Sequence, residues 1–327
     1  MTPGGEIKVR DARPLPAEQL AALARARRLC WWSLLLLSGT TVMMYLSMGG
    51  SQAMKTALVE DVLSLMPPLA FLVACWFQRK PIDVEYANGR SRAFDVNFLI
   101  ASVALTGVGV ALVWDSAHTL LTRTHPVIQT VEIGGALVWQ GWVMIAALVV
   151  SSIPPVLLGR AKMRLARTLS LKPLHTDADT NKADWMTALA GIAGIVGIGY
   201  GLWWADAAAA LFIAVSVLKD GISNLRAAVR DMHDARPQEV DRGDADPITR
   251  DVRDAVAALD WVASCRVRLH EEGFYVCGAI FIQPVGEGVA AGQLRAAHEA
   301  ARAVHWRVDE IVVTLEGEES ADAGTDG

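Results

Sequence analysis

The feature that most constrains this chain is a series of six apolar windows, each close to the length that a helix needs to cross a bilayer. One crossing takes about twenty residues. The windows are Leu29–Met48, Ala57–Phe77, Ala93–Trp114, Ile133–Leu158, Ala183–Trp204 and Ala205–Leu225. Hydrophobic residues make up 53% of the chain, which excludes a disordered or fibrous protein. The sequence therefore predicts a mainly α membrane protein with a bundle of six transmembrane helices.

Aromatic and basic residues indicate how these helices are oriented. Tryptophans lie at several window edges, Trp31, Trp114 and Trp203 among them, as in the aromatic belt of membrane proteins. Lys and Arg gather in the loops on one side, whereas the loops on the other side offer only Lys55 and Arg123. The positive-inside rule then places both termini in the cytoplasm. We expect an integral, multi-pass protein of the cell (inner) membrane, in contact with the lipid bilayer.

After the sixth window, the spacing of apolar residues changes and predicts a small cytoplasmic domain. An order of helix, strand, strand, helix and strand is typical of a ferredoxin-like αββαβ fold. The predicted organisation is an N-terminal cytoplasmic segment at 1–28, a six-helix transport domain at 29–228, a linker at 229–247, the ferredoxin-like domain at 248–316 and a disordered acidic tail at 317–327. The net charge of −5 argues against nucleic acid as a partner.

Ionisable side chains inside the second window are the first candidates for a functional site, because charges in a membrane helix are costly. Glu60 and Ser64 are four residues apart and share a helix face, whereas Asp61 points about 100° away. Pro67 and Pro68 lack an N–H, which leaves two backbone carbonyls in the preceding turn without their helical donors. The alternative is a simple proline kink whose acidic residues pair with basic residues elsewhere.

The start of the fifth window carries a second polar stripe. Asp177, Asn181 and Asp184 are spaced four and three residues apart, and Thr180 adjoins Asp184 at the i, i+4 spacing. Capping of the helix start is the alternative for Asp177 and Asp179. It does not suit Asp184, which lies deeper in an apolar helix. Two helices that each present a carboxylate and further oxygen atoms can hold a divalent cation.

Other classes of protein are less well supported. Four cysteines show no C-x-x-C spacing, so neither a disulfide framework nor a zinc finger is indicated. The chain carries no Ser/His/Asp arrangement, H-E-x-x-H motif or phosphate-binding loop, which argues against a membrane enzyme.

Four segments together resemble the cation diffusion facilitator family of divalent metal/proton antiporters. They are ALVEDVLS (Ala57–Ser64), PIDVEYANGRSRAFD (Pro81–Asp95), TDADTNKADWMTA (Thr176–Ala188) and WADAAAALFIA (Trp204–Ala214). The resemblance implies a secondary active transporter and not an enzyme, with no tightly bound cofactor, whose cargo is a divalent cation exchanged for protons. It also implies a homodimer held through the ferredoxin-like dimerisation domain.

The same resemblance assigns the transport site residue by residue. The family's four positions fall on Glu60, Ser64, Thr180 and Asp184, so only two of them are ionisable and no histidine remains. Asn181 and Asp61 are the candidates to replace the absent donor, and Asp177 is a further secondary candidate.

This imidazole-poor, oxygen-rich donor set changes the expected metal. Zinc favours nitrogen and sulfur ligands, whereas oxygen donors suit Mn²⁺, Fe²⁺ or Mg²⁺. We expect Mn, Fe, Mg or Co rather than a strict Zn site, although the sequence does not resolve which metal is carried.

Residues outside the membrane complete the resemblance. Arg92 and Asp234 match the positions of a basic and an acidic residue that would form a structural charge lock at the cytoplasmic membrane face. Asp83 matches a family aspartate, but Tyr86 stands at the usual histidine position, so we expect no second metal site there. In the cytoplasmic domain the His and Asp ligands of zinc-binding relatives are replaced, for instance by Cys265 and by Thr314–Glu316, so we expect no built-in zinc sensor there. The alternative to a transporter is a transport-deficient relative that acts as an interaction or sensory module, and it predicts no metal-dependent proton flux.

Overall fold

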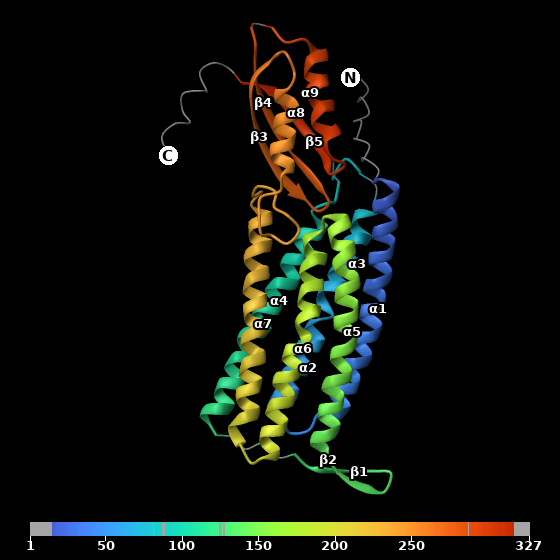
Figure 1. Ribbon diagram of the computed structural model, residues 1–327, viewed down its shortest axis with the longest axis vertical. Coiled ribbons are helices and arrows are strands. Elements are labelled where there is room, and N and C mark those ends of the chain that lie inside the picture. Colours follow the sequence, from blue (N-terminus) through green and yellow to red (C-terminus); the bar gives the residue numbers. More distant parts are fainter. Residues whose placement is uncertain are drawn as a thin grey trace, which may run out of the picture. The chain divides into compact units, whose positions relative to one another are not determined.

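The computed structural model describes residues 15–80, 82–86, 89–123, 126, 128–286 and 288–316 (Figure 1). The predicted tail at 317–327 and the first part of the predicted N-terminal segment lie outside these residues. The chain divides into two compact units. We call them the helical unit (Ala21–Arg79 and Ala93–Val229) and the sheet unit (Lys80–Arg92 and the chain from Arg230, with the stretch before Ala21).

The described residues of the helical unit form seven helices, which run alongside one another in Figure 1. They are α1 (Ala17–Ser47), α2 (Gln52–Leu63), α3 (Met66–Gln78), α4 (Ala93–Leu121), α5 (Gln140–Leu169), α6 (Lys172–Gly199) and α7 (Trp203–Met232). Helix α6 contacts α2, α3, α4 and α5, so its polar stripe lies within the bundle. A short antiparallel hairpin of β1 (Thr130–Ile133) and β2 (Ala136–Trp139) joins α4 to α5; the sequence interpretation did not include it.

Four stretches of the described chain are long and apolar enough to cross a membrane. They are Ala17–Ser47, Gln52–Gln78, Ala93–Leu121 and Gln140–Leu169. The predicted fifth and sixth windows fold as α6 and α7, which have 28 and 30 residues but carry more charged side chains. A count of six spans therefore stays a prediction, while the membrane character of the protein rests on the four.

The second predicted span is interrupted near its middle, where Ser64 and Leu65 keep right-handed helical backbone angles. Helix α2 ends at Leu63 and α3 begins at Met66, with Ser64 as the C-cap of α2. The reason is local, because Pro67 and Pro68 cannot donate backbone hydrogen bonds and fit best in the first turn of a new helix. The break falls one turn after Glu60, inside the bundle.

Glycines let α7 approach α4 very closely. A Cβ atom on Gly221 would lie 2.8 Å from the backbone of Thr106, and one on Gly109 would lie 2.9 Å from the Cα atom of Leu218. Real side chains do not fit at such distances, so the two backbones are in direct contact at these points. This packing fixes the position of α7 along α4.

The sheet unit contains α8 (Ile248–Ala257), β3 (Val262–Glu272), β4 (Tyr275–Pro284), α9 (Ala291–Val304) and β5 (Val308–Leu315). Its strands are ordered β3-β4-β5, with β4 antiparallel to β3 and parallel to β5. The core is formed by apolar side chains from both helices and all three strands, including Val252, Ile280 and Ala297. The helix and strand order is the one predicted; the sheet has three strands, and its assignment as ferredoxin-like remains a prediction.

The stretch predicted as a linker is partly structured. Helix α7 continues to Met232, and Gln238 forms a β-bridge with Ala245. Two Arg242 nitrogens donate to the two carboxylate oxygens of Asp231, at 3.1 and 2.9 Å. These contacts tie the turn at 238–245 back to the end of α7.

Candidate cation site

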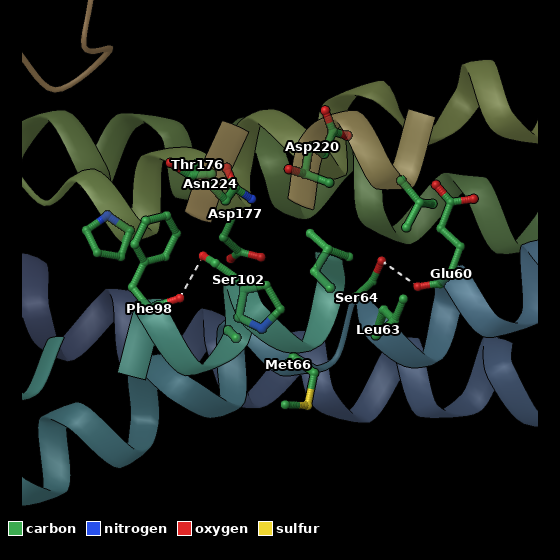
Figure 2. Close-up of a pocket in the computed structure, with 16 residues that line it drawn as sticks. Glu60, Leu63, Ser64, Met66, Phe98, Ser102, Thr176, Asp177, Asp220 and Asn224 are labelled. Carbon is green, nitrogen blue, oxygen red and sulfur yellow. Dashed lines mark hydrogen bonds between the residues drawn. The ribbon is translucent and has the colours of Figure 1, made fainter. Parts of the chain in front are cut away.

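A small cavity lies inside the helical unit, beside the break between α2 and α3. Its volume is about 50 Å³, room for a few water-sized groups. Residues with oxygen-bearing side chains line it from four helices: Glu60 from α2, Ser102 from α4, Thr176, Asp177 and Thr180 from α6, and Asp220 and Asn224 from α7, with Ser64 at the break. Apolar residues such as Met66 and Phe98 close the remaining wall (Figure 2). The cavity is therefore lined mainly by apolar surface, with several oxygen-bearing residues set among the apolar ones.

Glu60 and Ser64 stand at the α2 side of the cavity. The Ser64 hydroxyl donates to the backbone carbonyl of Glu60 at 3.0 Å, the bond drawn in Figure 2. This leaves the lone pairs of the hydroxyl oxygen available to a cation. The Glu60 carboxyl interacts electrostatically with Asp184 and Asp61. Because these charges have the same sign, the group attracts cations.

Asp184 belongs to the same electrostatic group but does not line the cavity. Its carboxyl interacts with Asp61, Asp177 and Asp220, and with the positive charge of Lys162. Thr180, one turn before it on α6, does line the cavity. The structure thus brings Glu60, Ser64 and Thr180 to one chamber, with Asp184 interacting with Glu60 from α6.

Asp177 and Asn181 are engaged with each other and with a buried lysine. Nζ of Lys162 on α5 lies 2.6 Å from Oδ2 of Asp177, and the Asn181 amide donates to Oδ1 of Asp177 at 3.2 Å. Helix α6 begins at Lys172, so Asp177 does not cap its start, and the capping alternative is wrong. The Asp177 charge is compensated by Lys162, and Asn181 does not line the cavity.

Asp61 has a buried oxygen whose hydrogen-bonding capacity is unused. Among the described residues, Oδ2 of Asp61 is one of few buried side-chain oxygens without a hydrogen-bond partner. It lies next to Glu60 in sequence and interacts with both Glu60 and Asp184. Such an oxygen is costly to bury unless something positive or protonated satisfies it.

These carboxylates are spread over several helices and do not form a compact cage. In the described ranges, no three His, Cys, Asp or Glu side chains converge closely enough to hold a metal ion. The arrangement instead places carboxylate, hydroxyl and amide side chains among the residues that line a chamber of about 50 Å³. Such a set suits a hard divalent cation that keeps part of its hydration shell.

Sequence reasoning missed several residues of this region. Asp220 and Asn224 of α7 line the cavity, as do Ser102 and Thr176. Asp220 and Asn224 are four residues apart, a spacing that could have indicated a polar helix face. They lie in the sixth predicted span, however, whose apolar sequence is interrupted by several charged residues. Nothing in the sequence places α7 beside α2, and so the signal could not be joined to Glu60.

Asp206 is a second functional candidate that the sequence interpretation did not use. It is fully buried at the start of α7 and accepts three hydrogen bonds from the first residues around α2. The donors are the Ser51 hydroxyl at 2.6 Å and the backbone amides of Gln52 at 2.5 Å and Ala53 at 3.2 Å. A carboxylate at a helix N-terminus also complements the helix dipole. Asp206 therefore anchors the helix that carries Glu60.

The loop that precedes α4 belongs to the sheet unit, and its arginines form ion pairs within that unit. Arg90 pairs with Asp83 at 2.7 Å and lies over the Tyr86 ring, and the Arg90 hydrogen bond is the main cause that lowers the pKa of Asp83. Arg92 bridges two carboxylates, with Nη2 at 2.9 Å from both Asp234 and Glu272. The predicted partners Arg92 and Asp234 are thus in contact; their action as a charge lock stays a prediction.

Comparison with known proteins places the chain in a family. Residues 31–233, well over half of the chain, match the cation efflux transmembrane domain family. The chain belongs to this family of membrane transporters, as its resemblance to the cation diffusion facilitators predicted. It is also 22% identical, over 169 residues, to the manganese efflux system protein MneS of Bacillus subtilis (strain 168). That match covers 52% of this chain and 54% of MneS, so the chain spans about half the length of this curated relative.

Proposed function

We propose that the protein exports a divalent metal cation from the cytoplasm in exchange for protons, and that Glu60 and Asp184 carry the exchanged charge. The observation that carries the proposal is the oxygen-lined cavity, which contains Glu60, lies inside the matched family region and adjoins the electrostatic partner Asp184. Ser64 and Thr180 contribute neutral oxygens to the same chamber.

The donor chemistry supports a metal that accepts oxygen ligation. The cavity lining offers carboxylate, hydroxyl and amide groups and contains neither His nor Cys. Such ligands suit Mn²⁺, Fe²⁺, Mg²⁺ or Co²⁺ better than they suit Zn²⁺. The distant relative MneS is a manganese efflux protein, and we take Mn²⁺ as the first cargo to test.

Proton exchange follows from charge balance in a low dielectric. Glu60, Asp61 and Asp184 interact with one another, whereas Asp177 has its own counter-ion in Lys162. Several like charges cannot remain close in the membrane without a positive partner. Protons provide it when the site holds no metal, and the metal displaces them when it binds.

Movement of the loaded site between the two membrane faces completes the cycle. If the bundle changes access only when it carries metal or protons, downhill proton entry drives metal out. We further propose that the protein works as a homodimer, with the sheet unit as the dimerisation domain. Because Ser64 and Thr180 cannot ionise, fewer protons should be exchanged per metal ion than in relatives with four ionisable ligands.

A flux assay tests the function. Full-length protein in proteoliposomes, given Mn²⁺, Fe²⁺, Co²⁺, Mg²⁺ and Zn²⁺ in turn under a pH gradient, should transport at least one oxygen-favouring cation faster than Zn²⁺. Glu60→Gln should abolish this flux, while Glu85→Gln, an exposed change outside the bundle, should leave it intact. Absence of flux for every cation would reject export and favour the interaction or sensory alternative.

A further inference from the structure

We propose that α7 supplies a third wall of the cation site, with Asp220 as a carboxylate ligand and Asn224 as an amide ligand or water-binding neighbour. This inference rests on the proposed function and extends it, because it assigns binding residues to a helix outside the α2 and α6 positions. The ligand class is a hard divalent cation that takes oxygen donors.

The cavity itself is the first observation. Asp220 and Asn224 line the same chamber as Glu60 and Ser64, and all four are labelled in Figure 2. The two α7 residues are four apart, so they present their oxygens on one helix face. An ion in the chamber therefore meets α2 on one side and α7 on another.

Electrostatics provides an independent link. The charge of Asp220 also acts on Glu60 and Asp184, more weakly than that of the other carboxylates around them. Its neighbour Lys219 contributes a positive charge but is exposed. Asp177, the other carboxylate of the lining, already holds the Lys162 ammonium. Among the described lining residues, Glu60 and Asp220 are thus the carboxylates not committed to a lysine.

Close helix packing holds Asp220 in place. The adjoining residue, Gly221, is pressed against the backbone of Thr106 on α4, and Gly109 of α4 is pressed against Leu218 one turn before Gly221. Asp220 thus extends from a part of α7 that cannot shift along α4 without a clash. A half-buried acidic side chain fixed in this way at a cavity is suited to repeated cation binding.

Charge balance explains why a carboxylate from α7 would matter for cation binding. Ser64 and Thr180 occupy two of the four family positions without a charge, and a divalent ion needs anionic partners to offset its lost hydration. A carboxylate from α7 restores one of the charges that the α2 and α6 positions have lost. A carboxylate from α7, together with hydroxyl and amide oxygens, further favours Mn²⁺ or Mg²⁺ over Zn²⁺.

The test compares Mn²⁺ transport kinetics of full-length variants in proteoliposomes. Asp220→Asn should raise the KM for Mn²⁺ about 10- to 100-fold, the loss expected for one charged contact. Ser223→Ala, an exposed change on the same helix, is the matched control and should keep the wild-type KM. A KM for Asp220→Asn equal to that of the wild type would overturn the proposal.

A rescue experiment separates binding from a structural role. Ser64→Asp returns a carboxylate to the opposite wall, so the double variant Ser64→Asp/Asp220→Asn should recover much of the Mn²⁺ affinity. Failure to recover, with both variants folded, would contradict a ligand role. If Asp220→Asn does not fold, the single variant Asn224→Asp tests the α7 wall instead. Its added carboxylate should lower the KM for Mn²⁺. An unchanged KM would then reject the α7 wall.

The outcomes distinguish this inference from the proposed function. If the wild type carries no cation, both fall. If the wild type transports Mn²⁺ and Glu60→Gln abolishes transport while Asp220→Asn and Asn224→Asp change nothing, only the α7 wall is rejected.

Discussion

The ammonium of Lys162 on α5 lies 2.6 Å from the carboxylate of Asp177 on α6, and the two side chains are only 0% and 4% exposed. Asp177 does not cap the start of α6, and the pair is shielded from solvent. Asp177 lies in the wall of the cavity. Lys162 neutralises one of the carboxylates that line the cavity beside Glu60. The pair therefore leaves Asp177 without a free negative charge.

Removal of one partner should be more damaging than removal of both. Lys162→Met leaves Asp177 buried without a counter-ion, and breaking a buried pair in this way costs about 3–5 kcal/mol. The double variant Lys162→Met/Asp177→Leu removes both charges and should be clearly more stable than the single variant. Thermal unfolding in detergent measures both. A double variant that is no more stable than Lys162→Met would show that the two side chains do not act as a pair.

Loss of the Asp206 carboxylate should loosen α2 at its start. Asp206→Ala leaves the Ser51 hydroxyl and two backbone amides without their acceptor, and each buried orphan costs about 1–3 kcal/mol. Asp206→Asn keeps one acceptor oxygen and should be milder. The check is the unfolding temperature of the two variants, together with hydrogen exchange of the amides in Gln52–Leu63. Wild-type protection of these amides in Asp206→Ala would refute the anchoring role.

The ion pairs of Arg92 should be unequal. Asp234 is 50% exposed, and exposed pairs are worth about 0–1 kcal/mol, whereas the Glu272 side chain is only 14% exposed and receives two Arg92 nitrogens. Double-mutant cycles on stability should give a larger coupling energy for Arg92 with Glu272 than with Asp234. A cycle with no coupling for either pair would remove the charge lock from this account.

The same cluster should make the sheet unit sensitive to pH. The hydrogen bond to Glu272 raises the pKa of His270 above 6.5, and the hydrogen bond to His270 lowers the pKa of Glu272 below 4.5. The histidine contribution is fully present below pH 6.5 and is lost as pH rises through its raised pKa. The glutamate contribution is present above pH 4.5 and is lost as pH falls through its lowered pKa.

Both contributions therefore overlap between about pH 4.5 and 6.5. His270→Gln should remove the loss of stability on the alkaline side of this window and leave the acid side largely in place. Unfolding temperatures of the full-length protein across pH 4–8 provide the measurement. The control is His298→Gln, which removes a histidine whose pKa is lowered mainly by burial. A variant curve parallel to that of the wild type would show that His270 does not contribute.

The sequence predicted what depends on local periodicity and composition. Four apolar stretches, the helix–strand–strand–helix–strand order after the linker, and the pairing of Arg92 with Asp234 could be read from the spacing of residues or from the family resemblance. Glu60, Ser64 and Thr180 also line one chamber.

Long-range packing was beyond such reasoning. The side chain that pairs with Asp177 comes from another helix, and Asp177 therefore reads as a helix cap when only its own helix is considered. In the same way, the glycines that press α7 against α4 bring Asp220 to the cavity, but their spacing alone does not name the partner helix. The β1–β2 hairpin was missed because its residues were counted as part of a loop and of an apolar window.

The most direct test of the account measures metal and proton movement together. Proteoliposomes that contain full-length protein and an internal pH indicator are given Mn²⁺ on one side, and both fluxes are followed for the wild type, Glu60→Gln and Asp184→Asn. The account predicts that Mn²⁺ moves only with a counter-flow of protons, that an imposed pH gradient drives it, and that both variants lose the two fluxes together. Mn²⁺ flux that moves no protons and ignores the pH gradient would contradict it.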